Sequence, residues 1–450
     1  MPQTASHSTS FGDTRGLLAE LYAVATEAVN PGPALAARLR ALSPARGKGP
    51  WILALGKAAM PMARAVVEVL RERGTEPAGG LIVAPRADDS PHPRLPVVVG
   101  DHPEPGPGSL AAADALGEVA ARIGDGDDVW VLLSGGTTSL IGAPESGISP
   151  RDLTALYSLL LGSGLDITAM NRIRKRFSRW GGGKLARALA PAAVKVYVVS
   201  DVIGDDLASI GSGPCVPDPA TALEVRRLLE QSALWDRIPS SARSLVAAME
   251  AGRSPETPKP GDDAFTRVSL EVIASNRLAL EAAGRHAAAL GLEPEVAAEP
   301  LAGEAAAAGA SLAAFLLQHC GRADIPQQDT VRSPRRCFIW GGETTVTLGS
   351  EAPGLGGRCQ ELALAAARAL DGAGTGIALL AAGTDGRDGP TDAAGAIVDG
   401  ATWPAVRATG RDPARDLRVH DAYRALDAAG ALLRPGLTGT NVMDVVIGIC

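Results

Sequence analysis

The sequence has few aromatic residues, and its cysteines follow no familiar pattern. Phe, Trp and Tyr together make up 3% of 450 residues, so Ala, Val and Leu must fill the core. The five cysteines form no CxxC pair, and their number is odd. We therefore expect no zinc site, no disulfide framework and a reducing, cytoplasmic location. The polar first residues lack the apolar core of a signal peptide, and no apolar stretch is long enough to cross a bilayer.

Several motifs of nucleotide-binding and hydrolytic enzymes are absent. There is no GxxxxGK[ST] loop, no HRD or DFG of a protein kinase, and no HExxH or GxSxG. No GxGxxG follows a strand, so a conventional dinucleotide fold is not supported. Lys and Arg number 43 against 50 Asp and Glu, a net charge of −7. An acidic chain is a poor candidate for binding nucleic-acid phosphates, and we expect no nucleic-acid or membrane partner.

The first part of the chain is typical of an α/β domain. Short apolar runs rich in Val and Ile alternate with longer helical patterns, which indicates a mostly parallel sheet covered by helices on both faces. The predicted strands are 51–55, 80–84, 96–100, 129–133 and 195–200.

A second α/β domain is expected after a proline-rich linker at 251–265. The alternation restarts with "VSLEVIA", followed by a helix from Asn276. We therefore predict an α/β protein of two domains, a Rossmann-like N-terminal domain (1–262) and a smaller α/β C-terminal domain (263–450).

Candidate site residues of the first domain follow its strands, where open α/β sheets bind ligands. Lys57 lies between a strand and a helix N-terminus, a junction that attracts phosphate. The turn after "VWVLL" could lay N–H groups and hydroxyls against an oxyanion. Its residues are Ser134, Gly135, Gly136 and Thr137. A solvated surface lysine and a plain Gly/Ser/Thr loop are the alternative interpretations.

Carboxylates and a second glycine turn follow the strand at 195–200. Asp201 and Asp205 come first, then Ser212 and Gly213 in a Gly-Ser-Gly-Pro turn. Magnesium favours one or two carboxylates together with substrate phosphates. Aspartates are also ordinary turn formers, so a structural role is the alternative.

The second domain repeats this arrangement. Glu343 and Thr344 follow a glycine pair after "FIW". Asp385 follows the later strand "GIALLAAG", and Asn441 precedes the last strand. Arg358 stands at a glycine-rich helix start, where a positive charge opposes the helix dipole. An arginine in that position could clamp a carboxylate or phosphate.

Together these segments resemble the MOFRL-type glycerate 2-kinases. The resemblance runs from about residue 17 to the end of the chain. It is carried by "LGKAAMPMA", "SGGTTSL", "MNRIRKRFSRWGGGKLA", "VSDVIGDDLASIGSGPCVPDP", "PETPKP", "WGGETTV", "GGRCQELALAAA", "GTDGRDGPTDAAGAIVD" and "TGTNVMD". It implies a Rossmann-like N-terminal domain, a smaller domain with the MOFRL region at about 335–446, and an active site between the two.

The implied reaction is ATP-dependent phosphorylation of D-glycerate at its 2-hydroxyl, giving 2-phosphoglycerate. The resemblance implies that Lys57, Arg358 and Asp201 are catalytic. The implied substrate- or nucleotide-binding residues are Ser134, Gly135, Gly136, Thr137, Ser212, Gly213, Glu343, Thr344, Asp385 and Asn441. Magnesium carried by ATP would be held by some of Asp201, Asp205, Glu343 and Asp385. A homodimer is one of the assemblies left open.

Three departures and three rival functions stay open. The first glycine turn reads "SGGTTS" where the family usually has a more serine-rich version. Gly181 stands where the family often has a lysine, and Cys359 stands where it has an asparagine. The rival functions are an NAD(P)H-dependent hydroxypyruvate reductase, a kinase for a related hydroxy or sugar acid, and a non-catalytic metabolite sensor. The missing GxGxxG argues against the reductase.

Overall fold

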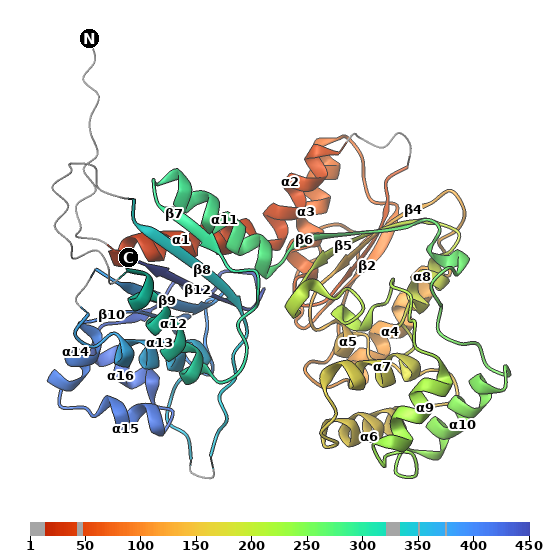
Figure 1. Cartoon of the computed structure of the whole chain (residues 1–450). Coiled ribbons are helices and arrows are strands. Elements are labelled where there is room, and N and C mark those ends of the chain that lie inside the picture. Colours follow the sequence, from red (N-terminus) through yellow and green to blue (C-terminus); the bar gives the residue numbers. More distant parts are fainter. Residues whose placement is uncertain (1–13, 43–47, 321–333, 350–351, 374–375) are drawn as a thin grey trace. The chain divides into compact units, whose positions relative to one another are not determined.

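A computed structural model describes residues 14–42, 48–320, 334–349, 352–373 and 376–450. The chain forms two compact units (Figure 1). Unit 1 comprises the described parts of residues 1–30 and 274–450, and unit 2 comprises those of residues 31–273. The division predicted from the sequence, 1–262 and 263–450, does not assign the first helix to the C-terminal part.

Unit 2 contains a six-stranded sheet in the order β3-β2-β1-β4-β5-β6. The pairings from β3 to β5 are parallel. The strands are β1 (Trp51–Leu55), β2 (Gly79–Ala84), β3 (Val97–Val99), β4 (Asp128–Leu133), β5 (Ala193–Val199) and β6 (Val268–Ala274). β6 is the segment expected to open the second domain, and it completes the first sheet instead.

Helices surround this sheet and form an additional helical region in unit 2. They are α2 (Pro31–Ala41), α3 (Ala59–Glu72), α4 (Pro107–Ala120), α5 (Thr137–Leu140), α6 (Pro150–Leu161), α7 (Ile167–Phe177), α8 (Lys184–Leu189), α9 (Ala222–Gln231) and α10 (Ser240–Glu250), with short 3₁₀ turns η1 (Ile203–Asp205), η2 (Ile210–Ser212) and η3 (Asp263–Phe265). β1 is buried at every position, which explains its continuous apolar sequence.

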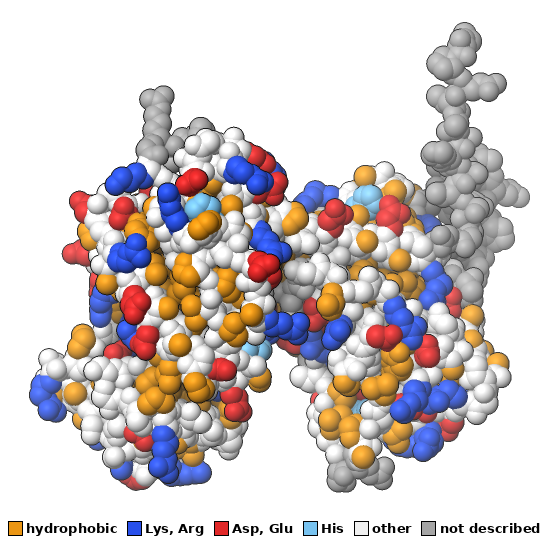
Figure 2. Space-filling model, turned by 180° about the vertical axis from the view of Figure 1, so that it is seen from behind, with side chains coloured by type: hydrophobic (Ala, Val, Ile, Leu, Met, Phe, Trp, Pro, Cys, Tyr) orange, Lys and Arg blue, Asp and Glu red, His pale blue; other side chains and the backbone are white. Residues whose placement is uncertain are grey.

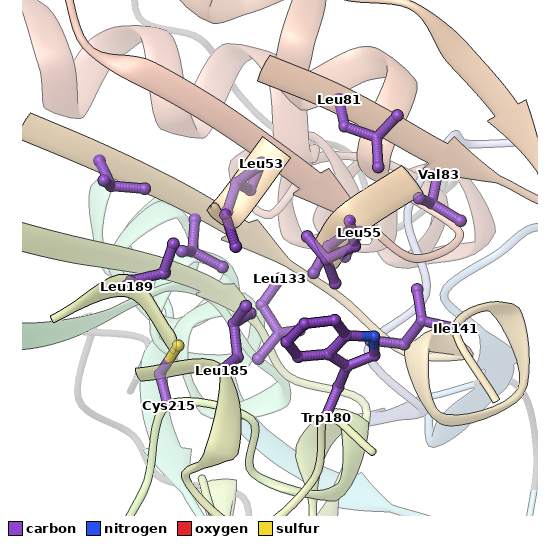
Figure 3. Packing of buried hydrophobic residues seen from close by; sticks show 14 of the residues in the cluster. Leu53, Leu55, Leu81, Val83, Leu133, Ile141, Trp180, Leu185, Leu189 and Cys215 are labelled. Carbon is purple, nitrogen blue, oxygen red and sulfur yellow. The ribbon is translucent and has the colours of Figure 1, made fainter. Parts of the chain in front are cut away.

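The core of unit 2 has two parts. Trp180 and Leu185 pack near Leu133 below the strands that carry Leu53 and Leu55 (Figure 3). A separate cluster is formed by apolar side chains of α6, α7, α9 and α10, including Ile173 and Phe177 of α7. Because α7 turns these two residues inward, its intervening basic residues face other surroundings.

Unit 1 contains a mixed six-stranded sheet in the order β11-β10-β9-β12-β8-β7. Only β7 and β8 pair in parallel; the other pairings are antiparallel. The strands are β7 (Glu293–Val296), β8 (Arg336–Gly342), β9 (Ala378–Gly383), β10 (Gly395–Asp399), β11 (Leu432–Leu433) and β12 (Asp444–Ile449). The helices are α1 (Thr14–Ala28), α11 (Asn276–Ala289), α12 (Ala305–Cys320), α13 (Arg358–Ala369), α14 (Thr402–Ala408), α15 (Pro413–Arg418) and α16 (Ala422–Ala428).

A disulfide joins Cys320 at the end of α12 to Cys450 after β12. The expectation of no disulfide is therefore wrong for these two cysteines. They are 130 residues apart in sequence, but their Cα atoms are 5.8 Å apart, a separation that a disulfide can bridge. Cys215, Cys337 and Cys359 are free and buried.

Among the described residues, no helix is long and apolar enough to cross a membrane. In the face shown in Figure 2, acidic and basic side chains are interspersed over both units.

Candidate active site

A glycine turn links β4 to α5 in unit 2, and two buried hydroxyls hold it in place. Ser134 Oγ accepts a hydrogen bond from the Ala58 N–H at 3.0 Å. Thr137 Oγ1 lies 3.0 Å from the Leu55 carbonyl and 2.7 Å from the Ser134 carbonyl. These side chains therefore join the ends of β1 and β4. Both were predicted to bind ligand, and their hydroxyls brace the turn.

Lys57 follows β1 and lies against this turn. Its N–H donates to the Gly135 carbonyl at 3.0 Å, and its side chain is exposed. Gly136 has a φ of +83°, and a Cβ there would be 3.1 Å from Lys57 Cγ. The glycine thus supplies the left-handed backbone and also the space in which the lysine stem lies.

Asp201 follows β5 and approaches the same glycine pair. A Cβ on Gly135 would lie 1.8 Å from Asp201 Oδ2, so only glycine admits the carboxylate at this distance. Burial raises the pKa of Asp201, and the charge of Lys57 opposes that rise. The structure therefore brings Lys57, Gly135, Gly136 and Asp201 together, a base with a cation beside it.

His102 is a neighbour of Lys57 that the sequence patterns did not single out. A Cβ on Gly136 would lie 3.1 Å from His102 Cδ2, as close as it would lie to the lysine stem. Burial lowers the pKa of His102, and the Lys57 charge lowers it further. A neutral imidazole beside a lysine adds a polar group without competing for an anion. No signal in the sequence indicated this contact.

The loop after β5 is held in an uncommon backbone conformation. Asp205 and Ser212 have φ values of +54° and +64°, which non-glycine residues rarely adopt. Ser212 Oγ lies 2.9 Å from Thr138 Oγ1, so the Gly-Ser-Gly-Pro turn is linked to the first residues of α5. The Ser212 and Gly213 carbonyls accept hydrogen bonds from Gly182 and Gly183 N–H groups, each at 2.8 Å. Ser212 and Gly213 thus connect two glycine turns.

Unit 1 has a second polar cluster around Arg358, the first residue of α13. Arg358 Nε and Nη2 lie 2.6 and 2.9 Å from the two carboxylate oxygens of Asp444. Its Nη1 lies 2.7 Å from Glu343 Oε1. Burial lowers the pKa of Arg358, but the hydrogen bond and charge of Asp444 outweigh it and raise the pKa overall. The two carboxylates explain how this arginine is tolerated at a helix N-terminus.

Asp388 provides the negative charge that the helix N-terminus of α13 favours. Its carboxylate accepts the N–H groups of Cys359 at 3.2 Å and Gln360 at 2.8 Å. Gln360 Nε2 also donates to Thr391 Oγ1 at 2.8 Å. Burial raises the pKa of Asp388 to about 7, although the two backbone hydrogen bonds lower it. Neither Asp388 nor Asp444 was identified from the sequence, although both lie inside the quoted motifs.

The remaining predicted residues of unit 1 occupy neighbouring turns. Asp385 Oδ1 accepts the Arg387 N–H at 2.9 Å, and the Asp385 carbonyl accepts the Thr438 N–H. A Cβ on Gly383 would lie 3.3 Å from Asp385 Oδ1 and 3.6 Å from Asp444 Oδ1. Both carboxylates therefore lie beside the backbone of Gly383.

Asn441 and Thr344 occupy contrasting environments. The exposed Asn441 accepts the Met443 N–H at 3.2 Å through its side-chain oxygen. Thr344, which follows Glu343, is buried.

The acidic residues predicted to bind metal are divided between the units. Asp201 and Asp205 belong to unit 2, and Glu343 and Asp385 belong to unit 1. In the part of the chain that is described, no three His, Cys, Asp or Glu side chains form a group that could hold a metal ion.

Comparisons with known proteins identify the family. A model described as "Domain of unknown function (DUF4147)" matches residues 17–247, and the MOFRL family model matches residues 336–444. "Glycerate 2-kinase" from Pyrococcus horikoshii is 37% identical over 89% of this chain and 87% of its own length. "D-glycerate 2-kinase" from Thermotoga maritima is 36% identical over 88% of this chain and 90% of its own length. The chain belongs to the MOFRL-type glycerate 2-kinase family.

Two further comparisons bear on this family. The crystal structure of glycerate kinase from Thermotoga maritima matches with a TM-score of 0.85 at 35% identity, covering 97% of this chain and 99% of that one. A protein from Agrobacterium vitis, 35% identical over 96% of this chain and 93% of its own, carries the name hydroxypyruvate reductase only provisionally. The predicted α/β fold class is confirmed.

Two of the departures from the family pattern, Gly181 and Cys359, have clear structural surroundings. Lys184, three residues after Gly181, is bound by Glu145 at 2.5 Å and by the Ser178 carbonyl at 2.7 Å. It is therefore committed to internal contacts and does not replace a lysine at Gly181. Cys359 is buried; burial raises the pKa of its thiol, and Asp444 raises it further through charge and a hydrogen bond. A neutral thiol at this position contacts the partner of Arg358.

Proposed function

We propose that the protein phosphorylates D-glycerate at the 2-hydroxyl with ATP, giving 2-phosphoglycerate and ADP. Identity to curated glycerate 2-kinases over most of the chain carries this proposal. The paired cation and carboxylate at the glycine turn of unit 2 support it, because phosphoryl transfer depends mainly on positioning and on stabilising charge.

We assign roles to residues of both units. The 2-hydroxyl oxygen forms a bond to the γ-phosphorus while the bond from that phosphorus to the ADP oxygen breaks. Asp201 takes the hydroxyl proton, and its raised pKa makes it a better base than an ordinary aspartate. The Lys57 ammonium and the Arg358 guanidinium stabilise the oxygens of the transferring phosphoryl group. Asp444 is a positioning residue, because it fixes the Arg358 fork through two contacts.

The glycine turns would position the substrates. Backbone N–H groups around Gly135 and Gly136 would donate to phosphate or carboxylate oxygens. The Ser212 and Gly213 N–H groups already donate to the Ser209 and Ile210 carbonyls, so that turn would contribute through its shape and its link to α5. Glu343, Thr344, Asp385 and Asn441 would contact glycerate or nucleotide from unit 1. The buried Ser134 and Thr137 hydroxyls act by holding the turn.

The residues fit a magnesium ion that arrives with ATP better than a resident ion. Such an ion needs one or two carboxylates, and the rest of its shell comes from phosphates and water. Asp201, Asp205 and Asp385 make no ion pair among the described residues, whereas Glu343 is paired with Arg358. We propose that one or two of the first three would hold it, with Glu343 as a weaker candidate. Bound there, the ion would neutralise charge on the phosphates.

The reductase reading has less support. A hydroxypyruvate reductase needs a nicotinamide site, and the chain lacks GxGxxG after a strand. A kinase for a related hydroxy acid remains the second candidate, because the polar groups described would suit any small 2-hydroxy acid.

The test is a pair of assays on the purified full chain. D-glycerate, ATP and magnesium are supplied, ADP release is followed, and NMR identifies the phosphoglycerate isomer. A parallel reaction contains hydroxypyruvate and NADH. We expect ATP-dependent 2-phosphoglycerate and no loss of NADH. NADH oxidation without ADP release would overturn the kinase proposal, and turnover of another hydroxy acid alone would replace the substrate.

A further inference from the structure

Lys175 on α7 is a buried lysine without a partner. The residue is 6% exposed, yet among the described residues its ammonium makes no hydrogen bond and no ion pair. The next residue, Arg176, is fully buried and has four partners: Glu256, Thr257, Asp218 and the Ala220 carbonyl. Buried charges are normally paired, so the absence of a counterion at Lys175 is the unusual feature.

The carboxylates near Lys175 are already engaged elsewhere. Asp218 lies 2.8 Å from Thr257 Oγ1 and 3.4 Å from Arg176 Nη2. Asp206 accepts hydrogen bonds from the Ser209 hydroxyl and the Ala208 N–H. Their charges raise the pKa of Lys175, but burial outweighs them and lowers it overall. A ligand carrying negative charge would supply what these carboxylates do not.

Lys175 opens into a hollow of about 490 Å³ formed by α7, the loop after β5, and α9. Two further cations line this hollow, Arg172 and Arg227, and neither has an ion-pair partner within 4.0 Å in the described chain. Thr168, Asn171 and Ser209 add hydroxyl and amide groups to the wall. Three acids also line the hollow: Asp206 and Asp218, which are engaged as described above, and Glu224, which is bound to Thr221 in the capping box of α9.

We propose that this hollow binds a phosphate-type anion through Lys175, with Arg172 and Arg227 as further cationic contacts. Three cations, of which only one is buried, suit an anion that enters from solvent and places one charged group against the ammonium. The phosphate could come from the nucleotide or from a separate phosphorylated metabolite. Ser209 belongs to the same loop as Asp201 and Ser212, so the bound anion would contact the segment that carries the proposed base. The site does not depend on the proposed kinase activity.

The test is calorimetric titration of pyrophosphate into the full chain at low ionic strength. All proteins carry Lys57→Ala, so that binding at the glycine turn does not contribute. We expect Lys175→Met to weaken binding by about tenfold or more, because a charge-assisted contact is lost. Lys195→Met, on the exposed face of β5, is the matched control and should leave binding unchanged. Arg227→Gln should give a smaller loss.

Thermal unfolding of the same variants guards against misfolding. Lys175→Met removes an unpaired buried charge, so its melting temperature should equal or exceed that of the Lys175 parent. Equal pyrophosphate affinity with and without Lys175 would overturn the proposal, and so would equal losses in Lys175→Met and Lys195→Met. Competition with a non-hydrolysable ATP analogue then assigns the source: displacement of pyrophosphate indicates nucleotide phosphates, and unchanged binding indicates a separate metabolite.

Discussion

Arg358 and Asp444 form a two-pronged ion pair across 86 residues of sequence, with contacts of 2.6 and 2.9 Å. The aspartate is nearly buried, and the arginine side chain is 35% exposed. One edge of the guanidinium is thus fixed by the protein, while another reaches Glu343 and solvent. This geometry suits a cation that must present a constant orientation to a substrate.

Replacing Asp444 by asparagine should lower kcat/KM by about 10- to 100-fold, since a charged hydrogen bond contributes about 1.5–3 kcal/mol. The measurement is steady-state ADP release. Asp444 acts through Arg358, so Arg358→Lys and Asp444→Asn should show strongly non-additive losses in a double-mutant cycle. Glu299→Gln removes an exposed carboxylate of unit 1 and should be silent. Fully additive losses would contradict the positioning role.

Lys57→Ala should reduce kcat by about 10²–10³-fold, the usual cost of losing one electrostatic donor to the transition state. Lys195→Ala, an exposed lysine of the same unit, is the control. Rapid-quench measurement of a single turnover would separate the chemical step from product release. Near-normal turnover by Lys57→Ala would remove this lysine from the mechanism.

Gly135→Ala should impair catalysis without unfolding the protein. The added methyl would lie 1.8 Å from Asp201 Oδ2, so the carboxylate or the turn must move. A displacement of about 1 Å can cost about 10² in rate. Gly124→Ala is the matched control, because a methyl there meets nothing within 4 Å. Activity assays should be paired with thermal melts, and full activity in Gly135→Ala would mean that the Asp201 position is not critical.

Because of Asp388, the free energy of unfolding should decrease as pH rises. Its pKa is about 7 in the folded protein against an ordinary value of 3.8, so the folded state holds more protons between these values. Stability from this group is complete below about pH 4 and is lost as pH rises through 7, with a slope of at most about 1.4 kcal/mol per pH unit. Urea unfolding from pH 5 to 8 should show a flatter profile for Asp388→Asn. Identical slopes would show that Asp388 is already ionised.

The Cys320–Cys450 disulfide should stabilise unit 1 by up to roughly 5 kcal/mol, because it closes a long loop. Thermal melts with and without a phosphine reductant would measure this. The Cys320→Ser variant should have the melting temperature of the reduced wild type, and reductant should not change it. If the wild type melts identically in both conditions, the cysteines are not paired in solution.

The candidate residues at the strand ends were predictable because local sequence patterns mark these positions. Lys57 after "WILAL" and Arg358 at a glycine-rich helix start lie at the expected junctions. The partners were not predictable: Asp444 reaches Arg358 only through the pairing of β12 with β8 and β9. For the same reason, the sequence did not predict the disulfide or the pairing of β6 with the first sheet. Tertiary contacts between residues far apart in the chain leave no periodic signal in one sequence.

Unit 2 is one uninterrupted stretch, whereas unit 1 is assembled from both ends of the chain. α1 leaves the ribosome before its partners: it packs on α11, β9 and β12, and Tyr22 donates to the Gly383 carbonyl at 2.7 Å. At about 5–20 residues per second, the last of these partners follows roughly 20–80 s later. During that interval the native surface that covers Leu18, Leu21 and Tyr22 is incomplete. Although α1 is synthesised before all of unit 2, it is therefore among the last elements to be protected, and its apolar face must avoid wrong contacts while unit 2 is already folding.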